Sequence, residues 1–235
     1  MKTLLMLGIV LALALTALAY PTLSGPTGLL TVPTAAVAPG GQFQLAADLQ
    51  YVDGTDELVP LRALYGIGEK FEVGFTYLPE VNDANDTWGV NGKYVLPYTL
   101  GGAAWAIGAA YSDSDNVSTI GASLSATKEF AQGFKGTAAL LYADRDVDEV
   151  AGSNPDIAAQ VGDEDNHWAV ALGAQATLDN GLTVIGEYVN ALPGGSLNAA
   201  IRYPVTAATT VQLGFIGDTS ETTLGFTHTF GGSAK

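Results

Sequence analysis

The sequence of 235 residues contains no cysteine, which excludes disulfide bonds, thiolate metal sites and thiol catalysis. Basic residues are scarce, with 9 Lys and Arg against 24 Asp and Glu, and this balance argues against nucleic acid as a partner. The only two histidines are His167 and His228. Neither has a serine at a spacing typical of a nucleophile–base pair, and no GxSxG motif occurs. We therefore expect no catalytic residues and no enzymatic activity.

Long apolar runs are also lacking, apart from one at the N-terminus. Lys2 precedes a run of about twelve apolar residues, and the small-x-small pattern Ala17-Leu18-Ala19 follows it. That run is too short for a membrane-spanning helix, which needs about 20 residues. We expect residues 1–19 to be a secretory signal peptide, with a retained anchor as the alternative. Its removal leaves 8 basic and 24 acidic residues, a net charge of −16.

The remaining chain has an alternation of apolar and small or polar residues, interrupted by turns about every ten positions. Period two indicates extended strands with one apolar face, and the other face here is built from Gly, Ala, Thr, Asn and Gln. The segments that follow the pattern are 42–52, 58–67, 70–78, 87–96, 104–112, 117–128, 134–143, 167–178, 182–190, 196–203, 209–216 and 222–230. Each is close to the nine to eleven residues of a membrane-crossing strand. The fold predicted is therefore all-β, a transmembrane antiparallel up-and-down β-barrel of about 12 strands, with 10 to 14 also compatible.

Charge and aromatic residues support this arrangement independently. The connections alternate between short turns, of which 97–103 is the longest, and mostly longer acidic loops that hold 18 of the 24 acidic residues. Short periplasmic turns and longer outer loops are typical of outer-membrane barrels. Aromatic side chains fall at the strand ends, where a membrane interface favours them. The interface residues predicted are Tyr51, Tyr77, Trp88, Trp105, Tyr111, Trp168 and Phe230. A secreted soluble β-sandwich stays the alternative.

Two stretches resemble known families. Residues 222–230 resemble the alternating, Phe-ending closing strand of bacterial outer-membrane (porin-like) β-barrels, which implies contact with membrane lipid and with the outer-membrane assembly machinery. The tail 231–235 departs from that pattern, because the family signal usually ends at the aromatic residue. Residues 25–35 resemble the TGL-x-x-x-PTA stretch of YjbH-like barrels, which implies a link to exopolysaccharide export.

These assignments divide the chain into a signal peptide (1–19), a segment that is either periplasmic or a plug (20–40), the barrel (41–230) and a tail (231–235). Inside the barrel, the register predicts a cluster of inward charges. It consists of Asp48, Arg62 and Glu72, with Asp48 directly opposite Arg62, and is extended by Lys93, Glu187 and Arg202. Paired charges could serve to fix the strand register, or could form a constriction that filters polar solutes. The other inward residues are small and predict a narrow, water-filled lumen rather than a packed one.

Closely spaced carboxylates in the predicted loop 144–166 suit hard divalent cations. The residues concerned are Asp144, Asp146, Asp148, Asp163 and Asp165. Loose binding of Ca²⁺ or Mg²⁺ and a merely solvated acidic rim are the two interpretations, and no other cofactor is expected.

Together these features predict a protein of the bacterial outer membrane, a narrow passive channel for small polar solutes with weak cation preference. A non-conducting envelope barrel linked to exopolysaccharide secretion is the alternative. The sequence leaves the transported solute and the oligomeric state open.

Overall fold

The computed structural model describes residues 20–51, 58–79, 86–114, 117–147, 166–190 and 195–231, so the predicted signal peptide lies outside the described residues. The described part contains twelve strands and no helix long and apolar enough to cross a membrane. The strands are β1 (Phe43–Tyr51), β2 (Leu61–Ile67), β3 (Phe71–Leu78), β4 (Thr87–Leu100), β5 (Ala103–Ser114), β6 (Val117–Ala131), β7 (Phe134–Val147), β8 (Asn166–Thr177), β9 (Thr183–Asn190), β10 (Ser196–Pro204), β11 (Thr209–Ile216) and β12 (Glu221–Phe230).

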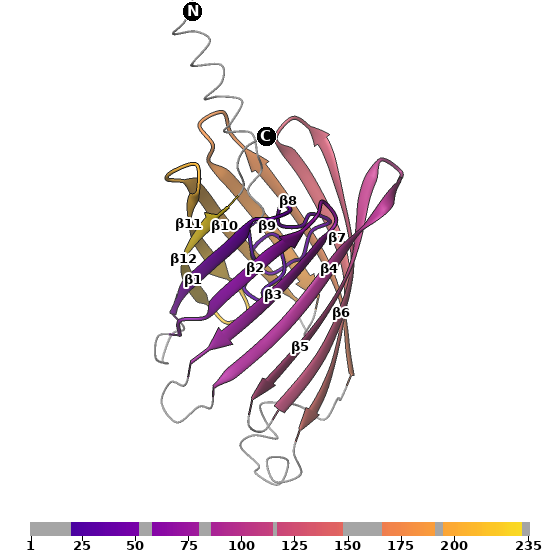
Figure 1. Ribbon diagram of the computed structural model, residues 1–235, viewed down its shortest axis with the longest axis vertical. Helices are drawn as coiled ribbons and strands as arrows, with labels where there is room; N and C mark the ends of the chain where they lie inside the picture. The colour runs from indigo at the N-terminus through magenta and orange to yellow at the C-terminus, as the bar shows by residue number, and fades with distance from the viewer. Residues whose placement is uncertain are drawn as a thin grey trace, which may run out of the picture.

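Every strand pairs antiparallel with its neighbours in sequence, and β1 pairs with β12, so the sheet closes into a barrel (Figure 1). The closing register runs from Phe43 opposite Phe230 to Tyr51 opposite Thr222. Closure leaves no strand edge unpaired, as a sheet surrounded by lipid requires. The predicted fold class, a twelve-stranded up-and-down barrel, is confirmed.

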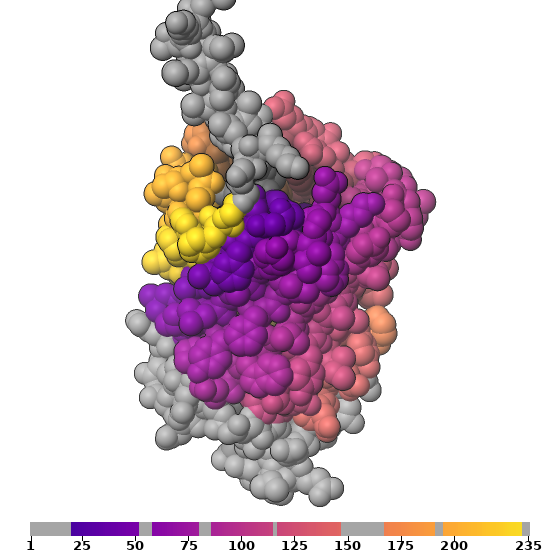
Figure 2. Space-filling view, in the orientation of Figure 1, coloured from indigo at the N-terminus to yellow at the C-terminus, as the bar shows by residue number. Residues whose placement is uncertain are grey.

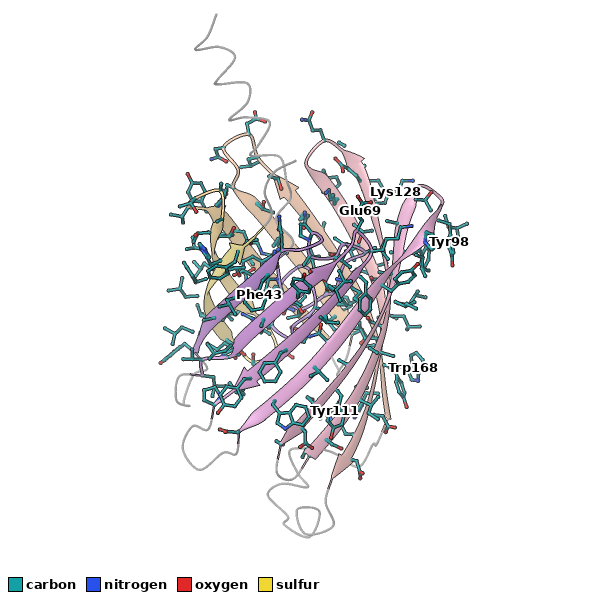
Figure 3. All side chains as sticks on the ribbon, viewed as in Figure 1. Phe43, Glu69, Tyr98, Tyr111, Lys128 and Trp168 are labelled. Carbon is teal, nitrogen blue, oxygen red and sulfur yellow. The ribbon has the colours of Figure 1, made fainter. Side chains whose placement is uncertain are left out.

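The outside of the barrel is apolar and its inside is polar. Along β12, Leu224 and Phe226 are about half exposed on the outside, whereas Thr223 and Thr227 are buried inside. Figure 2 shows one face of the outer wall, and Figure 3 shows side chains such as Trp168 pointing away from the barrel. This distribution is the inverse of a soluble β-protein and is typical of a barrel whose outer surface faces lipid. The protein is accordingly an outer-membrane barrel.

Two prolines account for the differences from the predicted ends of β2 and β4. Strand β2 begins at Leu61, directly after Pro60, because proline has no N–H to contribute to the ladder. Pro97 lies within β4, where the pairing with β5 shifts register between Val95 and Thr99. This bulge accommodates the proline and lets the strand continue to Leu100.

The predicted turn 97–103 is therefore wrong. The connection between β4 and β5 consists of Gly101 and Gly102 alone, both with positive φ (63° and 74°). Two successive residues with φ above zero form the tight hairpin turn that suits twisted strands, and glycine adopts it without strain. All five connections at this end of the barrel have two to five residues, as expected for the periplasmic side.

Residues 20–40 lie inside the barrel. We refer to them as the inner segment; its trace passes behind β2 and β3 within the ring of strands (Figure 1). Leu29, Leu30 and Val32 are at most 1 % exposed and pack against Ala171 of β8 and Ile185 of β9. The main apolar core of this protein is thus formed between the inner segment and the barrel wall.

Candidate functional site

The inner segment carries no charged side chain, and it contains four prolines: Pro21, Pro26, Pro33 and Pro39. It folds as successive turns held by a few backbone hydrogen bonds, among them Gly28 N–H to the carbonyl of Tyr20 and Leu29 N–H to that of Val32. It forms no strand ladder, so many of its N–H and C=O groups need other partners. Buried main-chain groups without partners would cost about 1–3 kcal/mol each.

Two carboxylates of the barrel wall accept hydrogen bonds from these N–H groups. Glu187 of β9 accepts from the backbone N–H of Leu30 (2.7 Å), Thr31 (3.0 Å) and Val32 (3.2 Å), and from the Thr31 hydroxyl (2.8 Å). Three successive N–H groups converging on one carboxylate form an anion-binding concavity. This one side chain therefore fixes three successive N–H groups of the turn at residues 29–32 to the wall.

Glu72 of β3 makes a comparable set of contacts. It accepts hydrogen bonds from the N–H (2.8 Å) and hydroxyl (2.5 Å) of Thr27 and from the N–H of Ala38 (2.7 Å). Residues 27 and 38 are far apart within the inner segment, so this one carboxylate joins its two halves.

Three basic side chains bind the carbonyl groups of the same segment. Arg62 donates to the carbonyl of Thr22 (2.9 Å), and Lys93 donates to that of Thr27. Arg202 donates to the carbonyls of Gly28 (3.1 Å) and Leu29, and its guanidinium lies 4.0 Å from the centre of the Tyr20 ring. Hydrogen bonds from charged groups to main-chain carbonyls are about twice as strong as neutral ones.

The predicted charge cluster is arranged differently from the expectation. Asp48 is not directly opposite Arg62, because β1 and β2 pair with Ala46 opposite Arg62; the two side chains nevertheless form a fully buried ion pair across the diagonal. Glu72 does not join this pair. It is opposite Lys93 on β4 and forms a second buried ion pair with it, with 3.1 Å between Nζ and Oε1.

The remaining two predicted charges, Glu187 and Arg202, have no ion-pair partner among the described residues and bind the inner segment instead. Arg202 also donates to Gln212 Oε1 (2.6 Å). All six charged side chains of the predicted cluster are at most 8 % exposed.

Small inward residues make room for the inner segment. A Cβ atom at Gly173 would overlap the Leu29 side chain, and one at Gly214 would lie 3.0 Å from Leu30 Cδ1. The sequence interpretation of such residues, a water-filled lumen, is wrong for this part of the barrel, because the space that they leave is occupied by Leu29 and Leu30. Small inward residues can leave room either for water or for an inserted segment, and only the position of residues 20–40 shows which of the two fills the space.

The predicted cation ligands are only partly within the described residues. Asp144 and Asp146 belong to β7, which continues to Val147 and so is longer than predicted. Asp148, Asp163 and Asp165 lie outside the described residues. In the part of the chain that the structure describes, no group of three or more His, Cys, Asp or Glu side chains could hold a metal ion.

The predicted interface aromatics have their side chains on the barrel's outside. Tyr51, Trp88, Trp168 and Phe230 are 40–64 % exposed, and Tyr77, Trp105 and Tyr111 are half-buried. Rings from neighbouring strands contact each other, as do Tyr142 and Trp168, whose centroids are 4.8 Å apart. In Figure 3, Tyr98 lies towards the end with the short turns and Tyr111 towards the opposite end. Their depth in the bilayer stays a prediction.

The two histidines are far apart around the barrel. His228 of β12 is 2.9 Å from the hydroxyl of Thr209 on β11, and His167 belongs to β8. Strands β9, β10 and β11 separate β8 from β12.

Sequence reasoning missed the residues of the inner segment that contact the wall charges, among them Thr22, Thr27, Thr31 and Ala38. It also missed Thr127, which accepts from the N–H of Ala35, and Gln212, which accepts from Arg202. A signal was present. A stretch of 21 residues without any charge, rich in proline and threonine, directly precedes a barrel whose predicted interior holds six charges.

The closed barrel, its apolar exterior and its polar interior define the fold as that of an outer-membrane, porin-like β-barrel. Comparison with solved structures agrees. The chain is similar to the KdgM porin in complex with disordered oligogalacturonate (TM-score 0.58, 8 % identity, covering 82 % of this chain and 99 % of that one). It is similar to the NanC porin in its rhombohedral crystal form (TM-score 0.56, 9 % identity, 80 % and 99 %). It is also similar to an outer-membrane channel from Pseudomonas putida F1 (TM-score 0.55, 11 % identity, 83 % and 98 %).

No protein family matches the sequence, and a comparison with curated proteins also found no match.

Proposed function

We propose that this protein is an outer-membrane channel for small polar solutes with weak cation preference, and that solutes pass when the inner segment moves from its site. One observation carries this proposal: the closed barrel encloses six buried charged side chains in its interior while its outside is apolar. Buried charges are costly in a barrel that serves only as a membrane anchor, whereas channels use charged rings to select solutes.

The distribution of charge supports the cation preference. The outer ends of the strands carry carboxylates such as Asp86, Asp113, Asp218 and Glu221, and the whole chain has a net charge of −15. An acidic mouth raises the local concentration of cations and lowers that of anions within about 8–10 Å at physiological salt. The six lumen charges are balanced, three of each sign, so they add little to this preference.

The solved structures of similar fold are described as porins or as an outer-membrane channel, which is consistent with transport. One of them holds an oligogalacturonate. A polyanion of this kind would be repelled by the acidic mouth of this chain, so we propose neutral or cationic solutes instead.

Planar-bilayer recording of the refolded protein tests the proposal. We expect infrequent current steps from the native chain, and more frequent steps from Glu187→Ala, which removes the carboxylate that binds the turn at 29–32. Under a salt gradient the reversal potential should have the sign of a cation-preferring pore. Glu129→Ala is the matched control, because Glu129 forms an exposed ion pair with Lys135, with 3.8 Å between the charged atoms, at the periplasmic hairpin.

The absence of steps above background in both the native protein and Glu187→Ala, across a wide voltage range, would refute the channel and favour a non-conducting envelope barrel. A reversal potential of the opposite sign would refute only the cation preference.

A further inference from the structure

We infer that the inner wall of the barrel is a binding site for an uncharged, turn-rich peptide. The wall recognises main-chain groups of that peptide, and in this structure residues 20–40 of the same chain occupy the site. This inference goes beyond the proposed channel and does not depend on conduction.

The contacts of the wall are mainly with peptide main chain. Glu72 and Glu187 accept from the N–H groups of residues 27, 30, 31, 32 and 38, while Arg62, Lys93 and Arg202 donate to the carbonyls of residues 22, 27, 28 and 29. Both kinds of main-chain group are thus matched by wall charges of the appropriate sign. Charges that served only to pair with one another would not need these contacts with the main chain. Charges that bind a polypeptide would make such contacts.

Shape adds selectivity to this chemistry. Leu29 and Leu30 fill the space above Gly173 and Gly214, and Thr27 and Thr31 each donate a hydroxyl hydrogen bond to a carboxylate that also binds their own N–H. A ligand therefore needs apolar residues between two hydroxyl-bearing ones, in a tight turn. A charged side chain at these positions would be left in a buried site without a partner.

The ligand is preorganised by its own sequence. Its four prolines restrict the backbone before binding, which lowers the entropy lost on association. Gly28 lies where the segment folds back on itself: a Cβ atom there would overlap the carbonyl of Val32 and the side chain of Thr22. Gly28→Ala should therefore disrupt the bound shape of the segment while every wall residue stays unchanged.

The inner segment joins the barrel strands at one point, through Gly40 and Gly41, which lead into β1 at Phe43. Its other contacts with the wall are noncovalent. A separate peptide of the same sequence can therefore form the same contacts, provided that the attached segment is displaced.

A cross-linking experiment on the full-length, refolded protein tests this site, and the absence of native cysteine makes it specific. The barrel carries Gly28→Ala, which displaces its own segment, and Gly173→Cys, which places a thiol beside the position of Leu29. The probe is a synthetic peptide of residues 20–40 with Leu29→Cys, activated as a thiopyridyl disulfide. Attack by the barrel thiolate forms the protein–peptide disulfide and releases thiopyridone, which is followed by its absorbance.

We expect this peptide to react at least about tenfold faster than an otherwise identical peptide that also carries Gly28→Ala, since a tenfold ratio requires only about 1.4 kcal/mol of binding selectivity. A barrel with Gly173→Cys and Leu29→Ala, whose smaller side chain leaves room for the thiol, keeps its own segment in the site and should react slowly with both peptides. If Gly28→Ala prevents folding of the barrel, Thr31→Pro serves instead, since it removes the N–H that Glu187 accepts.

Equal rates for the two peptides would overturn the inference, because reaction would then depend on thiol exposure alone. The inference would also be overturned if the peptide without Gly28→Ala reacted equally fast with the displaced barrel and with the barrel that keeps its own segment in the site. Either result leaves the conductance measurements untouched, so failure of the peptide site and failure of the channel are distinguishable.

Discussion

Replacement of Glu187 by alanine should release the inner segment from the barrel wall. The carboxylate accepts three backbone N–H bonds of 2.7–3.2 Å and one hydroxyl bond of 2.8 Å from residues 30–32, and it is 4 % exposed. The alanine variant retains none of these bonds. The barrel itself keeps its strand pairing, because the backbone of β9 is unchanged.

The size of the effect follows from these bonds. A hydrogen bond to a charged group contributes about 1.5–3 kcal/mol net, and the released N–H groups are solvated by water once the segment leaves. Contributions that share one acceptor are not additive, so we take about 3 kcal/mol for the set rather than the full sum. This corresponds to roughly a hundredfold increase in the ratio of released to bound segment.

Thiol labelling measures this ratio directly. Ala35 is buried, and its N–H donates to the hydroxyl of Thr127 (2.9 Å), so the only thiol of an Ala35→Cys variant reacts with a membrane-impermeant maleimide only after release. We expect the labelling rate to rise about a hundredfold when Glu187→Ala is added. Glu129→Ala should leave the rate unchanged.

Heat-modifiable migration in a detergent gel confirms that each variant still forms a barrel. An intact barrel whose labelling rate changes less than about threefold on Glu187→Ala would refute the reasoning, since it would mean that the carboxylate contributes under about 0.7 kcal/mol to seating.

Three further predictions follow from other parts of the structure. Gly173→Leu should also raise labelling at Ala35→Cys, because its side chain would occupy the volume of Leu29; Gly186→Leu on the neighbouring strand, where a Cβ meets nothing within 4 Å, is the control and should not. Gly101→Val should destabilise the β4–β5 hairpin by about 1–2 kcal/mol, because a β-branched residue disfavours the φ of 63°, and the loss is measured as a lower urea midpoint of unfolding from vesicles. Leu224→Arg, on the outside near the middle of β12, should cost about 2–4 kcal/mol in the same assay, and a cost near zero would mean that this face does not contact lipid.

Strand positions were predictable because alternation is a local property. The side-chain period of two is visible in any segment such as 71–78, and a turn residue marks each end. Prolines limited the accuracy of the predicted strand ends. Pro97 lies in a strand because a bulge removes it from the hydrogen-bond ladder, and a bulge depends on pairing with β5, which the sequence of β4 alone does not indicate.

The lumen was less predictable. The six charged side chains of the predicted cluster are buried in the structure, and the Asp48–Arg62 alignment differs from the prediction, since the β1–β2 register places Ala46 rather than Asp48 opposite Arg62. A shift of two residues keeps every side chain on the same face, so no hydrophobic pattern opposes it. Glu72 of β3 pairs with Lys93 of β4, the next strand in sequence, and not with Arg62. The resemblance of residues 25–35 to YjbH-like barrels stays a prediction.

The sequence by itself determined the fold class, the direction in which each strand residue faces and the apolar exterior, because each of these depends on residues close together in the chain. Only the tertiary structure decided that residues 20–40 lie inside the barrel. Their main-chain groups meet Glu72, Glu187, Arg62, Lys93 and Arg202, which come from five different strands, and such contacts exist only once the barrel has closed. A segment without charge has no local pattern that indicates its partners, so its position follows from the shape and charge of the wall that surrounds it.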